Sequence, residues 1–154
     1  MFWPFSEKFS MESVEEPDVM LVSSKDFQKT SNLIWTELLV SEDYSDITLV
    51  SSDLTLVKAH KAILGYSSEF FENLFKLSRS EGTPIVYLKG VQHLTLESML
   101  TFIYTGECQV EKDNLASFLE FGNDMKISGL LNTCKVEDIS NTNVKLKAAK
   151  IFLI

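Results

Sequence analysis

The chain is poor in the residues that build metal sites and disulfides. It contains two cysteines and two histidines among 154 residues. Cys108 and Cys134 lie far apart in the sequence, and no second pair of ligands accompanies them. Because a structural zinc site needs four closely spaced ligands, the composition argues against a bound metal. Reduced thiols of this kind are typical of cytosolic or nuclear proteins.

Positive charge and long apolar runs are also scarce. Lys and Arg number 14 against 22 Asp and Glu, which gives a formal net charge of −8. Since phosphate affinity comes from Lys and Arg, this balance argues against direct nucleic-acid binding. No apolar run approaches the roughly 20 residues that a membrane-spanning helix needs, so no membrane contact is expected. The aromatic start of the chain is too interrupted, by Pro4 and Glu7, for a signal peptide.

The signatures of common enzyme classes are missing as well. The sequence has no Gly-x-Ser-x-Gly elbow, phosphate-binding loop or His-Glu-x-x-His motif. Asp46 and His60 could be nominated as a catalytic pair with one of the serines, but no motif supports that choice. We predict a protein that is not an enzyme and that has no catalytic residue or cofactor. His60 is then a partly buried residue bonded to backbone, and His93 is a surface or capping residue.

The chain does contain enough apolar residues for one globular domain. Hydrophobic residues make up 45% of the sequence, and 11 of them are Phe, which argues against disorder. Three segments are expected: a flexible leader at 1–17, a folded domain at 18–132, and a C-terminal tail or truncated linker at 133–154. The aromatic residues of the leader leave an alternative open, in which it covers a hydrophobic groove in this chain or in a partner.

Residues 46–77 carry the clearest structural pattern. Residues 46–50 and 54–59 are rich in β-branched and apolar side chains, and Ser-Ser-Asp separates them. This arrangement predicts a β-hairpin. The next residues, 60–64, change to helical spacing, which stops at Gly65.

A Phe-rich helix follows, with Ser67 or Ser68 as its N-cap. The apolar face predicted for this helix consists of Phe70, Phe71, Leu74, Phe75 and Leu77. The other expected elements are helices at 26–40, 92–104 and 114–122, the start of a helix at 125–131, and β-prone runs at 19–22, 84–88 and 107–110. Asp113 or Asn114 is expected to cap the helix at 114–122. Helices and short strands in this order predict an α+β fold.

Three pieces of this pattern, taken together, resemble the BTB (POZ) domain. They are Asp46-Ile47-Thr48-Leu49-Val50, Lys58-Ala59-His60-Lys61, and Ser67-Ser68 with Phe70-Phe71. The resemblance continues through Tyr104-Thr105-Gly106-Glu107 and covers roughly residues 20–132. It implies a BTB/POZ fold, in which a cluster of about five to six helices is flanked by a short mixed β-sheet.

The resemblance also implies a dimer. In BTB domains the first helix packs against its counterpart in a second subunit, and the strand before it can pair with the partner's sheet. The corresponding interface here consists of Val19, Leu21, Phe27, Leu33, Ile34, Trp35 and Leu38. Asp46 and Lys61 match a charged pair that lines a pocket at the dimer surface, and His60 matches the hinge after the hairpin. Loss of either charge is expected to damage folding or partner binding.

BTB domains of insect-type transcription regulators are the most similar group, through residues 58–61, 104–107 and 126–130. That group carries a Leu-Arg-Trp-Asn signature before its first helix, of which only the Asp26-Phe27-Gln28 end is present here. The resemblance implies a homodimerising interaction module in transcription or chromatin control, located in the nucleus. Its partners would be a second copy or another BTB protein, with a corepressor peptide in the dimer groove.

The alternative is a substrate adaptor for a cullin-3 ubiquitin ligase, which would place the protein in the cytoplasm. Such adaptors carry a hydrophobic-x-Glu motif in the loop after the Phe-rich helix. The matching positions are Arg79-Ser80-Glu81, in which Arg79 replaces the hydrophobic residue. Cullin-3 is therefore the less favoured partner.

Overall fold

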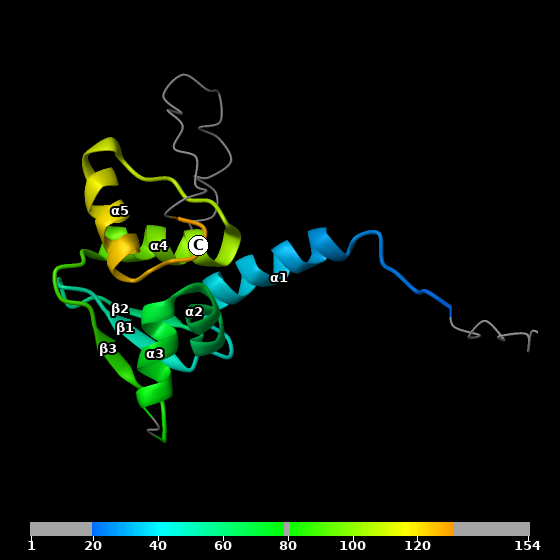
Figure 1. Cartoon of the computed structure of the whole chain (residues 1–154), viewed down its shortest axis with the longest axis horizontal. Helices are drawn as coiled ribbons and strands as arrows, with labels where there is room; N and C mark the ends of the chain where they lie inside the picture. The colour runs from blue at the N-terminus through cyan, green and yellow to red at the C-terminus, as the bar shows by residue number, and fades with distance from the viewer. Residues whose placement is uncertain (1–19, 79–80, 131–154) are drawn as a thin grey trace, which may run out of the picture.

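A small sheet packed against helices forms the computed structural model, which describes residues 20–78 and 81–130 (Figure 1). In chain order the elements are α1 (Phe27–Ser41), β1 (Ile47–Val50), β2 (Leu56–Ala59), α2 (Lys61–Ser67), α3 (Glu69–Leu77), β3 (Ile85–Tyr87), α4 (His93–Thr105), a 3-10 turn (Lys112–Asn114) and α5 (Leu115–Asp124). The predicted α+β class, with about five helices and a short mixed sheet, is confirmed. Within the described ranges, no helix has the length and hydropathy to cross a bilayer.

The three-stranded sheet is built around β1. This strand is antiparallel to β2 on one side and parallel to β3 on the other. The predicted hairpin is confirmed, with Ile47 opposite Ala59 and Val50 opposite Leu56. Side chains alternate across a strand, so Ile47 and Leu49 share one face, and both are fully buried against the helices.

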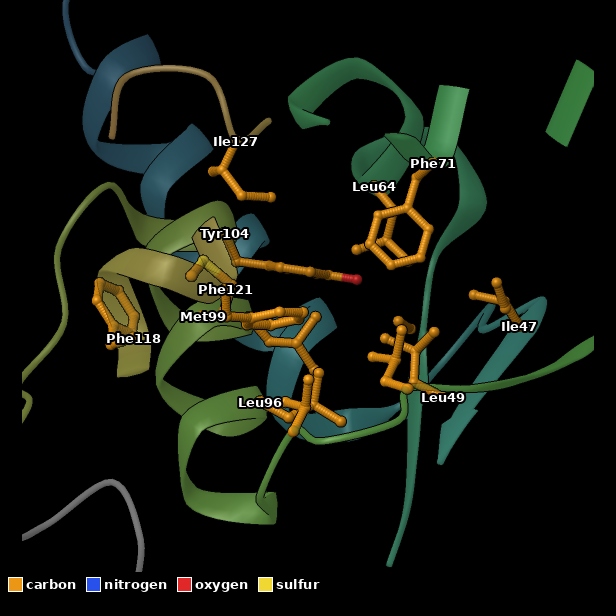
Figure 2. Close-up of a cluster of buried hydrophobic side chains, with 14 of the residues drawn as sticks. Ile47, Leu49, Leu64, Phe71, Leu96, Met99, Tyr104, Phe118, Phe121 and Ile127 are labelled. Carbon is orange, nitrogen blue, oxygen red and sulfur yellow. The ribbon is translucent and has the colours of Figure 1, made fainter. Parts of the chain in front are cut away.

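The core lies between this inner face and α2, α3, α4 and α5. Figure 2 shows Leu49, Leu64 and Phe71 on one side of the cluster, with Tyr104 of α4 reaching toward them. Burying one large apolar side chain contributes about 1.5–3 kcal/mol relative to exposure. The buried apolar residues are Ile47, Leu49, Ala59, Leu64, Phe71, Leu88, Val91, Leu96, Met99, Leu100, Tyr104, Phe118, Phe121, Ile127 and Leu130.

The end of α2 and the buried face of α3 differ from the prediction, whereas the α3 cap is one of the two predicted residues. α2 does not stop at Gly65 but continues to Ser67, since one helical glycine is tolerated at a cost of about 1 kcal/mol. Ser68 alone caps α3, and its Oγ accepts a hydrogen bond from the N–H of Phe71 (3.2 Å). The buried face of α3 is also narrower than expected, because Phe70 and Leu77 are exposed.

Three segments expected to be regular are not. Residues 20–22 and 107–110 form no strand within the described part of the chain. Residues 125–130 form turns, with Ile127 in an isolated antiparallel bridge to Ser68, instead of the start of a helix. Lys126 (φ 49°) and Gly129 (φ 81°) adopt left-handed backbone conformations, which a right-handed helix cannot contain.

The ends of α4 and α5 follow the predicted pattern more closely. Gly106 has φ 83° and closes α4 by donating its N–H to Phe102 O (2.8 Å), as expected for a C-terminal glycine. Asn114 occupies the cap position of α5, but its side chain makes no capping hydrogen bond. The preceding 3-10 turn leads the chain into the helix instead.

Gly122 is a point of close packing in the last turn of α5. A Cβ atom built on it would lie 1.9 Å from Leu130 Cδ2 and 3.1 Å from Met99 Cε. Leu130 and Met99 are themselves buried, so neither can move away freely. Glycine here lets the turns after α5 pack directly on the helix.

We expect Gly122→Ala to lower the free energy of unfolding by about 1–3 kcal/mol, because overpacking outweighs the better helix propensity of alanine. Gly65→Ala is the matched control, since a Cβ at Gly65 would meet Phe75 at an ordinary 3.5 Å. It should be neutral or stabilising. Urea denaturation of both variants checks this, and equal stability for the two would contradict the packing argument.

Candidate functional site

The most unusual surface of the molecule is the apolar side of α1. None of its residues is buried, and it extends away from the rest of the domain (Figure 1). Phe27 is 71% exposed, Leu33 64% and Trp35 42%. The further exposed apolar residues of this surface are Ile34 and Val40, together with Met20, Leu21 and Val22 before the helix. So many exposed apolar side chains on one helix and the segment before it mark an interaction site.

α1 is anchored at its C-terminal end alone. Leu38 and Leu39 are half-buried against the core, where α1 packs on α4. The first turn contains no acidic residue and the last turn no basic residue, and the side chain of Asp26 at the N-cap makes no capping hydrogen bond. A helix of 15 residues is marginal in isolation. Among the described residues, its N-terminal part therefore lacks the packing that usually stabilises such a helix.

Asp46 and Lys61, predicted to form a charged pair, do meet, but not as an ion pair. Asp46 Oδ1 accepts a hydrogen bond from the backbone N–H of Lys61 (2.7 Å). The two side chains form no salt bridge in the described part of the chain. Lys61 is the first residue of α2, and His60 in the N-cap position offers no side-chain cap. Asp46 thus caps α2 from the neighbouring strand end, and the charged pocket of Asp46 and Lys61 at a dimer surface stays a prediction.

His60 lies at the junction of β2 and α2 and is nearly buried. Its Nε2 is 2.6 Å from the carbonyl oxygen of Asp43, and its Nδ1 is 2.7 Å from Tyr104 Oη. The same hydroxyl accepts from the backbone N–H of His60 (3.1 Å). A neutral ring protonated on Nε2 satisfies every partner, because Nε2 donates to the carbonyl and Nδ1 accepts from the hydroxyl. The predicted bond from His60 to backbone is present.

Tyr104 is the partner that sequence reasoning missed. It reads as one more apolar position of the helix at 92–104, and no local pattern signals a bond to a residue 44 positions away. Burial, with a smaller contribution from the Asp46 carboxylate, raises the pKa of Tyr104 to about 12, against the lowering effect of the His60 N–H. The phenol therefore stays protonated and remains available as a donor to Nδ1.

Several predicted features cannot be placed. Val19 of the expected interface, Arg79-Ser80 of the cullin-type motif, and the leader and tail at 1–17 and 133–154 lie outside the described residues. His93 opens α4, with its Nε2 3.0 Å from Glu97 Oε1. Within residues 20–78 and 81–130, no three His, Cys, Asp or Glu side chains are grouped so as to hold a metal ion.

The sequence of the chain matches one protein family and several known proteins. The BTB/POZ domain model matches residues 35–142. Two proteins of Drosophila melanogaster are similar over this region: Protein tramtrack, alpha isoform, at 39% identity over 102 residues, and Sex determination protein fruitless, at 38% over 97 residues. The alignments cover 65% and 63% of this chain, but 12% and 10% of those proteins.

The chain thus spans about a tenth of the length of these two relatives. A third relative from the same organism is closer in size. Longitudinals lacking protein-like is 33% identical over 108 residues, which are 70% of this chain and 84% of that protein.

Because Asp46 caps α2, we expect Asp46 to contribute more to the free energy of unfolding than Lys61 does. Asp46→Ala should lower the free energy of unfolding by about 1 kcal/mol, as for a lost helix cap, and Asp46→Asn should cost less because the amide oxygen still accepts. Lys61→Ala keeps the backbone N–H and should remain within about 0.5 kcal/mol of the unsubstituted protein. Chemical denaturation measures all three. A larger loss for Lys61→Ala than for Asp46→Ala would restore the ion-pair interpretation.

The raised pKa of Tyr104 predicts a pH dependence of stability. The folded state holds the phenolic proton more tightly than the unfolded chain, so this contribution is intact below pH 10 and is lost as the pH rises through about 12. Tyr104→Phe should be less stable at neutral pH by about 1–3 kcal/mol, since it leaves buried His60 groups without a partner. The two proteins should converge in stability by pH 12.

Thermal unfolding between pH 7 and 12 tests this convergence. Burial also raises the pKa of Cys108, to about 11, but that thiol titrates in both proteins. The difference between them therefore reports Tyr104. A constant difference over the whole range would show that the phenol does not ionise differently in the folded state.

Proposed function

The chain belongs to the BTB/POZ domain family, and from this premise we propose that it is a non-enzymatic protein–protein interaction module that forms a homodimer through α1. The observation that supports this most directly is the exposed apolar surface of α1. The helix is firmly attached at Leu38 and Leu39, yet Phe27, Leu33 and Ile34 remain more than half exposed.

A twofold-symmetric dimer is the simplest way to cover this surface. In such a dimer the same patch on each subunit covers its counterpart, so one exposed helix per chain is sufficient. Phe27, Ile34 and Leu38 are spaced by seven and four residues, which places them along one side of α1. Leu33 and Val40, seven residues apart, form a second row on another side of α1.

The segments beside α1 support the same arrangement. Leu21 is 91% exposed in a stretch without strand partners among the described residues. Together with Val19 it would pair with the sheet of the second subunit. Asp46, Lys61 and the hinge residue His60 lie where the chain turns from α1 into the hairpin and α2. We place a corepressor-type peptide in the groove that the two subunits would form there.

The biological setting is proposed from the relatives. The chain aligns with a small part of two Drosophila melanogaster proteins, Protein tramtrack, alpha isoform, and Sex determination protein fruitless. This supports a role in transcription or chromatin control in the nucleus, with another BTB protein as the alternative partner to a second copy. The cullin-3 alternative gains no support from the described residues.

Light scattering on the purified chain tests the dimer. We expect about 35 kDa, twice the 17.5 kDa of one chain, and a mass that persists on dilution. Leu33→Glu should shift the mass to that of a monomer, because it places a carboxylate in the apolar surface. Leu94→Glu is the matched control, since Leu94 lies on α4 and is 63% exposed, against 64% for Leu33. It should remain a dimer.

Two results would count against the proposal. A monomer at every concentration would mean that α1 is covered within the chain or by a different protein. An unchanged mass for Leu33→Glu would place the subunit contact elsewhere. Circular dichroism of each variant shows that a change in mass does not reflect unfolding.

A further inference from the structure

β3 is an edge strand whose outer side is open in the part of the chain that the structure describes. On its inner side, β1 donates to Pro84 O (3.0 Å) and accepts from Leu88 N (2.8 Å). Because successive residues of a strand point their backbone groups in opposite directions, even-numbered residues face β1. Ile85 and Tyr87 therefore direct their N–H and C=O groups away from the sheet. Such a row of free donors and acceptors is a template for an added strand.

The two edges of this sheet are not equally protected. Native proteins often place a charged residue on an edge strand to discourage pairing. On β2, the opposite edge, Lys58 is exposed at a position that faces outward. β3 carries no charge, and its outward residues Ile85 and Tyr87 are 69% and 54% exposed. The β3 edge thus lacks the protection that the β2 edge has.

A groove lies directly beside this open edge. It has a volume of about 260 Å³ and is lined by Leu74 and Phe75 of α3 and by Pro84, Ile85 and Val86. Small-molecule sites are typically roughly 300–1,000 Å³. The groove is therefore better suited to a side chain or two than to a cofactor. Ile85 belongs to both features, so a strand added at the edge would have the groove next to it.

The groove is also lined by one positively charged residue, Lys61. This residue is partly exposed. Its side chain forms no ion pair within the described residues. The nearby Asp46 carboxylate is bonded to the Lys61 backbone instead (2.7 Å). The ammonium can thus bind an incoming carboxylate without first giving up another one.

We propose that the β3 groove, which comprises the free edge of Ile85 and Tyr87 with Leu74, Phe75 and Lys61, binds an extended peptide segment of a partner protein. The peptide adds a strand to β3, places an apolar side chain between α3 and β3, and directs an acidic side chain to Lys61. β3 lies at the far edge of the sheet from α1 (Figure 1). The β3 edge is therefore separate from the proposed α1 interface, and Lys61 is the one residue of this site that is also placed in the dimer groove proposed above.

Selection of a random peptide library against the full chain, followed by fluorescence polarisation with the enriched peptides, tests this site. We expect peptides in which apolar residues alternate and an acidic residue recurs. Tyr87→Pro should weaken their binding about tenfold or more, because it removes an outward N–H but no bond to β1. Lys61→Glu should weaken it by a similar factor through charge repulsion.

Leu56→Pro is the matched control, because it removes an outward N–H from β2. It should leave binding unchanged, and so should Leu33→Glu, which separates this proposal from the dimer. If Tyr87→Pro fails to fold by circular dichroism, Ile85→Lys replaces it as the edge-blocking variant. The proposal is overturned if no common peptide pattern emerges, if binding survives both Lys61→Glu and the edge variant, or if Leu56→Pro or Leu33→Glu abolishes it.

Discussion

Tyr104 Oη is the atom on which the relative placement of α1, the hairpin and α4 depends. It donates to the ring of His60 and accepts from the backbone of the same residue. The other side of that ring contacts Asp43 O, in the short connection that follows α1. This connection contains two strained positions, Glu42 (φ 58°) and Tyr44 (φ 59°), each costing about 1–2 kcal/mol. The buried network holds the strained connection in place, and with it the direction in which α1 leaves the domain.

Two open surfaces of different character result. The surface of α1 is broad and apolar, properties that suit a folded copy of the same surface. The β3 edge instead offers main-chain groups and a small groove, properties that suit a segment without structure of its own. β3 forms the edge of the sheet that lies far from α1 (Figure 1). One domain could therefore hold a partner subunit and a peptide at the same time.

Much of the fold was predictable, because local signals agreed with tertiary structure. Gly106 ended α4 where expected, and the Ser-Ser-Asp turn gave the hairpin. Residues 125–130 were not predictable, since their apolar spacing resembles a helix while Lys126 and Gly129 take left-handed conformations. The strand expected at 107–110 also failed, because a β-prone sequence does not supply a partner strand.

The contacts of the candidate site were even less predictable from local sequence signals. The sequence identified Asp46, Lys61 and His60 as residues that matter, since they form a recurring pattern. It could not show that a backbone amide, not the ammonium, takes the carboxylate of Asp46. Nor could it find the partner of His60 on a distant helix. Charge and hydropathy are properties of residues, whereas these contacts are set by how segments far apart in the chain are brought together.

The mixed character of the sheet has a consequence for how the domain assembles. β1 and β2 are joined by a tight turn, so their pairing closes a short loop. β3 pairs with the same strand only after α2 and α3 have been formed and folded back, which closes a much longer one. Closing a longer loop costs more entropy and slows folding. We accordingly expect β3 to join the sheet after β1 and β2 have paired, and to separate from it first in local opening.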